Sequence, residues 1–222
     1  MQALKTKFEG SPLLARVVPF AVFLGLTSLQ SLVGPAVASW LYFLKTLIGG
    51  WLVWMTWGMV SEMRWDFSLR ALGIGIFVCV FWVGLDSFYP HIGGKSEGWN
   101  PFVIFKDSAA LGWFFVVVRI LGSTIVVPPL EEVFYRSFMY RYLVDSNFST
   151  ISLAGIRAMP FWLSSIVFGF AHSQWLAGIL CGALYQWLVS RSGRLGEAMV
   201  AHAVTNCLLG IYIVYKGAWQ FW

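Results

Sequence analysis

Two adjacent carboxylates, Glu131 and Glu132, follow an apolar run and begin the most informative motif of this sequence. On a helix their side chains point about 100° apart, so the two acids need not share a role. Glu132 and Arg136 are four residues apart, on one helix face and in the order that favours an ion pair. That pair would keep Glu132 charged and leave Glu131 free to act elsewhere. Because an idle acid is costly at membrane depth, the motif favours a functional role over a simple helix-start pair.

Two histidines and an asparagine occupy other apolar stretches. His172 follows Phe168 by one helical turn and Asn206 follows His202 by one turn, so each pair shares a helix face. Taken singly, each histidine could be a core residue, and His202 with Asn206 could simply hydrogen-bond neighbouring helices. Since other polar groups inside apolar stretches are few, these side chains are expected to gather in one wet cavity.

A carboxylate, two imidazoles and an amide would suffice to hydrolyse an amide bond without a covalent intermediate. The carboxylate, beside an imidazole, can hold and activate a water as general base. Histidine and asparagine donors can stabilise an oxyanion. The sequence has no Ser-His-Asp order, no GxSxG and no HExxH motif, and Cys207 would point about 100° away from Asn206. A serine or cysteine nucleophile therefore lacks support.

The composition requires these motifs to lie in a membrane. Of the 222 residues, 59% are apolar and only 11% are charged, against about 25% charged in soluble domains. Aromatic residues make up 18% of the chain, which suits a protein with many membrane-interface anchors. The sequence predicts an all-α, polytopic transmembrane bundle of about seven to eight helices with an intramembrane polar cavity.

The expected helices belong to a single integral membrane domain, residues 1–222. An amphipathic segment over 130–143 is expected to be separate from the stretch before it, because Pro128-Pro129 favours a helix start or a kink. The apolar stretches, with boundaries uncertain by several residues, are 13–33, 39–60, 69–89, 109–128, 160–172, 174–190 and 196–215.

Lysine and arginine are distributed unequally over the expected topology. With a cytoplasmic N-terminus, only Lys95, Lys106 and Lys216 fall outside, so the positive-inside rule predicts this orientation. Lys45 and Arg119 lie within apolar stretches, and Arg119 could pair with Asp86 or Glu131. The basic residues on the cytoplasmic side would be Lys5, Lys7, Arg16, Arg64, Arg70, Arg136, Arg141, Arg157, Arg191 and Arg194.

The net charge of +5 comes from basic residues scattered singly between apolar runs, so no nucleic-acid partner is expected. Cys79, Cys181 and Cys207 also lie in apolar runs and share no metal-like spacing. They are expected to be packing residues.

The three motifs resemble those of the CPBP family. These intramembrane glutamate proteases include the type II CAAX prenyl endopeptidase and bacterial Abi or bacteriocin-immunity relatives. The matching residues are Glu131-Glu132-x-x-x-Arg136, Phe168-x-x-x-His172 and His202-x-x-x-Asn206, in the family's order. The resemblance implies a CPBP-like catalytic core over 120–210. The aromatic wealth and short loops also resemble a bacterial CAAX-protease-related subgroup associated with exosortase systems, which would place the chain in the bacterial inner membrane.

The resemblance implies a role for each motif residue. Glu131 corresponds to the water-activating glutamate, and Glu132 with Arg136 completes the first motif and orients it. His172 would help to bind the water, and the third motif would form the oxyanion site. The implied substrate is a peptide or protein, which could be lipidated or membrane-anchored, that enters from the bilayer or the cytoplasmic side. No cofactor is expected.

Two other interpretations stay open. Glu131, His172 and His202 could be the three ligands of a catalytic zinc ion with water in the fourth position. Alternatively, the polar cluster could serve a proton or ion pathway, or the chain could be a non-catalytic immunity or scaffold protein. An inverted repeat would support a transporter, and none is visible.

Overall fold

The computed structural model describes residues 2–94 and 98–222, so Lys95 lies outside the described residues. Within the described ranges the chain is helical and has no strand. The predicted all-α membrane bundle is confirmed. The helices there that are long and apolar enough to cross a membrane are α2 (Pro12–Gln30), α3 (Pro35–Thr56), the continuous stretch Ala109–Tyr142, and α11 (Leu195–Lys216).

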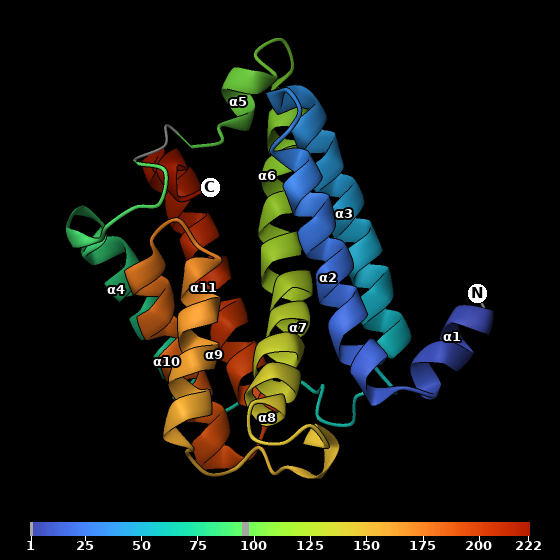
Figure 1. Ribbon diagram of the computed structural model, residues 1–222. Helices are drawn as coiled ribbons and strands as arrows, with labels where there is room; N and C mark the ends of the chain where they lie inside the picture. Colours follow the sequence, from blue (N-terminus) through green and yellow to red (C-terminus); the bar gives the residue numbers. More distant parts are fainter. Residues whose placement is uncertain (1, 95–97) are drawn as a thin grey trace.

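Shorter helices complete the bundle (Figure 1). Two of them are apolar, α4 (Leu69–Gly84) and α9 (Ala158–Phe170). Helix α9 packs against α10 (Trp175–Ser192), α4 packs against α11, and α2 packs against α3. The remaining short elements are α1 (Gln2–Glu9), α5 (Pro101–Ile104) and 3-10 turns at Asp86–Phe88, Phe148–Thr150 and Trp219–Phe221.

Of the two features expected at Pro128-Pro129, a helix start or a kink, the helix start was wrong, because the helix runs through it. Helix α6 (Ala109–Leu121) continues through a π-helical segment, Gly122–Val126, into α7 (Val127–Glu132). In that segment the Val127 N–H bonds the Gly122 carbonyl, and the next N–H along the chain would belong to a proline. The Ser123 carbonyl instead accepts a hydrogen bond from Asn206 Nδ2 at 2.8 Å. A partner from α11 thus replaces the donor that the prolines remove.

The same helix contains a second π-helical segment, which carries part of the first motif. This segment, Val133–Met139, leads into α8 (Tyr140–Tyr142). Wide turns of this kind occur frequently at functional sites. Here the segment lies in the middle of the bundle, between the α2–α3 pair and the helices α4, α9, α10 and α11 (Figure 1).

Glycines bring α9 and α10 into close contact. Gly178 and Gly182 lie four residues apart on α10, the spacing of a small-residue helix interface. A Cβ on Gly178 would lie 2.9 Å from the Cα of Gly169, and a Cβ on Gly182 would lie 3.2 Å from the Ser165 backbone. The close approach places His172, in the turn after α9, beside the helices that carry the other motifs.

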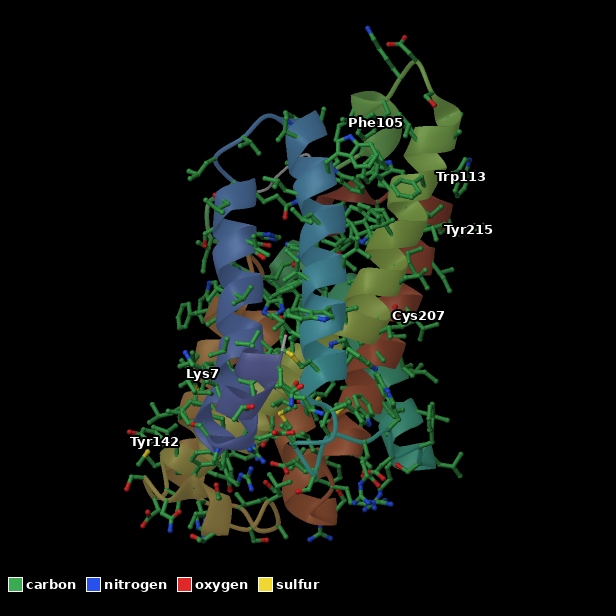
Figure 2. All side chains as sticks on the ribbon, turned by 90° about the vertical axis from the view of Figure 1, so that its right-hand side faces the viewer. Lys7, Phe105, Trp113, Tyr142, Cys207 and Tyr215 are labelled. Carbon is green, nitrogen blue, oxygen red and sulfur yellow. The ribbon has the colours of Figure 1, made fainter. Side chains whose placement is uncertain are left out.

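The bundle has two chemically different ends. The basic end is formed by residues 2–11, 57–68, 143–157 and 193–194, and the C-terminal end is formed by residues 85–94, 98–108, 171–174 and 217–222. Figure 2 labels Lys7 and Tyr142 toward the first end and Phe105 and Trp113 toward the second.

Candidate active site

Glu132 is the hub of the buried polar site. Its side chain has no solvent exposure, and its Oε1 lies 2.9 Å from Nδ1 of His202. Arg136 donates from Nη1 to the same oxygen at 3.2 Å, and its Nε lies 3.2 Å from Oε2. The predicted ion pair between Glu132 and Arg136 is therefore confirmed. Residues 70 positions apart meet here, since His202 comes from α11.

Arg136 is held from three sides. Its Nη2 donates to the carbonyl of Gly182 at 3.1 Å, and its guanidinium carbon lies 4.4 Å from the centre of the Phe168 ring. The cation is thus paired, hydrogen-bonded and stacked, which offsets the cost of burying it. Phe168, from the second motif, serves here as a packing residue.

The hydrogen bonds fix which ring nitrogens carry protons. A carboxylate only accepts, so neutral His202 must carry its proton on Nδ1, facing Glu132. His172 Nδ1 lies 2.9 Å from the Phe168 carbonyl oxygen, which also only accepts. In the neutral form, both imidazoles therefore keep a bare Nε2 that can bind a water or a metal ion.

Glu131 differs from its neighbour, as the 100° offset along the helix predicts. Its Oε2 has no hydrogen-bond partner among the residues that the structure describes and lies 4.0 Å from His202 Nε2. The carboxylate also interacts electrostatically with His172. With 15% of its side chain exposed, Glu131 is the less buried acid of the pair.

A cavity of about 350 Å³ lies next to these groups. Its lining includes His172, His202 and Asn206 from the predicted site, together with Ser123 and Arg119. Glu131 does not line it, and its Oε2 lies 4.0 Å from Nε2 of His202, which does. The lining includes the turn 171–174 and the last two residues of the chain but no segment of the basic end, so the cavity faces the C-terminal end.

Asn206 has two possible functions. One N–H of its amide satisfies the Ser123 carbonyl freed by the proline pair, which is a structural role. An amide group has two N–H donors, so the second can serve the cavity that Asn206 lines. Asn206 can therefore satisfy the Ser123 carbonyl of the long helix and at the same time offer a second N–H donor to the cavity.

Sequence reasoning missed Tyr185, on α10. Its ring stacks on His202 with centroids 5.2 Å apart and an interplanar angle of 28°, and its hydroxyl donates to Thr205 Oγ1 at 2.7 Å. Spacing did not single out this tyrosine, because aromatic residues are abundant in every apolar stretch. The Tyr185 ring packs on the face of the His202 imidazole, and the hydrogen bond to Glu132 orients that imidazole within its plane.

A second missed group positions the turn that carries His172. Trp82 packs edge-on against His172 with centroids 5.6 Å apart, and its Nε1 donates to Gln174 Oε1 at 3.1 Å. Gln174 Nε2 in turn donates to Asp86 Oδ1 at 2.8 Å. The expected pairing of Arg119 with Asp86 or Glu131 is not found. Asp86 instead contacts Gln174 and His91.

Among residues 2–94 and 98–222, no group of three or more His, Cys, Asp or Glu side chains is close enough together to hold a metal ion. The three cysteines are free, and Cys79 and Cys181 are buried as packing residues.

The fold and the site together define an integral membrane protein with a buried carboxylate and histidine centre beside a polar cavity. Residues 112–208 match the family model of type II CAAX prenyl endopeptidase Rce1-like proteins. The match supports the CPBP/CAAX protease family, and so confirms the resemblance carried by the three motifs. It also supports a CAAX protease kind of function, a hydrolase acting on protein substrates. No curated protein and no solved structure matches the chain.

Proposed function

We propose that this protein is an intramembrane endopeptidase that hydrolyses a peptide bond with a water activated by Glu131. The observation that carries the proposal is the unpartnered Oε2 of Glu131, 4.0 Å from His202 Nε2 at the edge of the cavity. All three motifs lie within the matched range 112–208, and we place them in a catalytic core over 120–210.

Each step of the reaction has a group in reach. Glu131 accepts a proton as the water oxygen attacks the carbonyl carbon, and His172 Nε2 helps to hold that water. The second N–H of Asn206 faces the developing oxyanion. A His202 that solvent has protonated on Nε2, between two carboxylates, also donates a hydrogen bond from that N–H to the oxyanion and keeps its proton throughout the reaction. Glu131 then returns its proton to the leaving amine as the C–N bond breaks.

The proposed topology keeps the N-terminus in the cytoplasm and places the chain in a bacterial inner membrane. The described part of the basic end carries Lys5, Lys7, Arg64, Arg157 and Arg194, whereas the described part of the C-terminal end carries Lys106. By the positive-inside rule the C-terminal end then faces away from the cytoplasm. Since the cavity faces that end, substrate enters from the extracytoplasmic side or laterally, and not from the cytoplasm.

A comparison of membrane proteomes tests the proposal. Cells that produce the wild-type protein are compared with cells that produce Glu131→Gln, and an uncut precursor should accumulate in the variant. Glu9→Gln, an acid exposed at the basic end, is the matched control and should leave the precursor processed. A Glu131→Gln protein that cleaves the precursor as fast as the wild type removes the mechanism. Loss of transport or of partner binding without any uncut precursor would instead support the non-catalytic alternative.

A zinc-dependent form of the same reaction is the second candidate, but it requires Glu131, His172 and His202 to come closer together, because no group of three such side chains among the described residues can hold a metal ion. Both histidines direct Nδ1 to an acceptor and leave Nε2 free, the arrangement typical of zinc-bound histidines with oriented rings. Glu131, His172 and His202 would be the ligands. Elemental analysis of the purified protein, with cleavage measured before and after chelation, decides between the two candidates. Full activity of a metal-free protein excludes the zinc form.

A further inference from the structure

Arg119 is a cation in the cavity wall without an acidic partner. None of the described carboxylates lies within ion-pair distance of its guanidinium, and the rings of Tyr42, Trp99 and Trp222 surround it at 5.0, 5.0 and 5.4 Å. Among the described residues lining the cavity, Arg119 is the only lysine, arginine, aspartate or glutamate. Arg119 is thus the one fully charged side chain in the described cavity wall, and no ion pair compensates its guanidinium there.

Lys45 shows what a buried cation with a purely structural role looks like in this protein. Its Nζ donates to Thr27 Oγ1 at 2.9 Å and lies over the rings of Phe23 and Tyr42. Lys45 is 4% exposed and does not line the cavity. Arg119 has the aromatic contacts but no hydrogen bond from its guanidinium to the described chain. A charged group at membrane depth costs a few kcal/mol unless it is paired, so its cavity-facing donors are suited to an anion.

We propose that Arg119 binds a carboxylate of the peptide substrate and so helps to determine which peptides are cleaved; this inference rests on the proposed function. Arg119 lies one helical turn, about 6 Å, from Ser123, which is bonded to Asn206. His202 lies one turn further along α11. Because Asn206 is the proposed oxyanion donor, the carboxylate would sit within a few extended residues of the reacting carbonyl. A peptide fits better than a lipid headgroup, because Arg119 shares its cavity with His172 and His202.

The test is a binding measurement that does not depend on cleavage. A fluorescently labelled apolar hexapeptide is titrated into Glu131→Gln protein in detergent micelles and followed by anisotropy. Three probes are compared: the peptide with a free terminal carboxylate, its C-terminal amide, and the amide with a glutamate three residues from its end. A carboxylate-bearing probe should bind about tenfold more tightly than the plain amide. The two acidic probes tell a terminal carboxylate from a side-chain one.

Variants decide whether Arg119 causes the preference. Arg119→Gln should abolish it, and Arg119→Lys, which keeps the charge but loses the two-pronged donor, should retain part of it. Lys106→Gln, an exposed cation at the same end of the bundle, should keep it in full. Equal binding of acid and amide, or a preference that survives Arg119→Gln, overturns the inference.

Two further outcomes distinguish this inference from lipid-headgroup binding by Arg119 and from the proposed function on which it rests. An alkyl phosphate that binds in an Arg119-dependent manner while the peptides show no preference would assign the residue to a lipid headgroup and overturn the proposal. If the wild-type protein cleaves none of the peptides but the Arg119-dependent preference stands, the proposed function fails and the assignment of Arg119 holds.

Discussion

Two buried networks of carboxylate and arginine both include residues of the long helix Ala109–Tyr142, and only one of them resembles an active site. The first is the Glu132 network, made of Glu132, Arg136 and His202. The second, nearer the basic end, is the Glu62 network, made of Glu62, Arg16, Ser137 and Arg141. Arg16 Nη2 contacts both Glu62 oxygens at 2.9 and 3.0 Å, and Ser137 and Arg141 both donate to Oε1.

The two networks differ in what they leave free. The Glu62 network contains no imidazole and borders no part of the cavity, and it joins α2, the loop 57–68 and the long helix. Burial raises the pKa of Glu62, but Arg16, the Ser137 hydroxyl and Arg141 lower it more, to about 2. So strong an acid cannot act as a base near neutral pH. A buried ion pair alone is therefore no indication of a candidate active site. An imidazole that lines a cavity, as that of His202 does, is such an indication.

The largest expected effect is that of Glu132→Gln. This change leaves Arg136 buried with no carboxylate partner and puts an NH2 donor against it, with only one amide oxygen left to accept from both Arg136 and His202, so stability should fall by about 3–5 kcal/mol and cleavage should be lost. Thermal unfolding in micelles and a peptide cleavage assay measure both. Glu131→Gln is the control, with cleavage lost and stability nearly unchanged. If Glu132→Gln is as stable as the wild type, the network does not hold the bundle together.

Glu62→Gln should separate stability from chemistry. The shift of the Glu62 pKa from 4.5 to about 2 corresponds to roughly 3 kcal/mol of stability at neutral pH, for a side chain that is 12% exposed. Cleavage per folded molecule should stay within about twofold of the wild type, since the network lies outside the cavity. A loss of cleavage as deep as that of Glu131→Gln would place Glu62 in the site after all.

Acid should weaken the Glu62 network. Because its pKa is lower in the folded protein than in the unfolded chain, its contribution is complete above about pH 4.5 and is lost as the pH falls toward 2. Between pH 6 and pH 3 the wild type should lose about 2 kcal/mol from this group. Unfolding midpoints of wild type and Glu62→Gln, measured across this range, should converge. Parallel curves would contradict the assignment.

The smallest expected effect is that of Asn206→Ala. It removes the partner of the Ser123 carbonyl and one oxyanion donor, so we expect a loss of about 1–2 kcal/mol in stability and about 10- to 100-fold in kcat. Both quantities are measured on the same preparation. If stability falls while kcat per folded molecule is unchanged, Asn206 only supports the helix and the oxyanion site must be sought elsewhere.

Local sequence patterns predicted the apolar helices and the contacts between residues one helical turn apart. The other features of the site depend on contacts between residues far apart in the sequence. Apolar stretches identified the spans, and the i, i+4 spacing identified the pair of Glu132 and Arg136. The helix through Pro128-Pro129 could not be foreseen, because its missing donor is replaced by Asn206, 83 residues from Ser123. The Glu62 network was equally hidden, since its acid sits in a polar loop. The bacterial subgroup and the individual catalytic roles stay predictions.

The helices around the site differ greatly in length. The stretch Ala109–Tyr142 has 34 residues, or about 50 Å, whereas α9 has 13 residues, or about 20 Å. A bilayer core is about 30 Å thick, so the long helix must tilt and α9 cannot span it unaided. Lipid beside the α9–α10 hairpin is therefore expected to thin locally. Such a dimple would draw headgroups and solvent down to the turn 171–174, so water could reach the buried acids without a transmembrane channel.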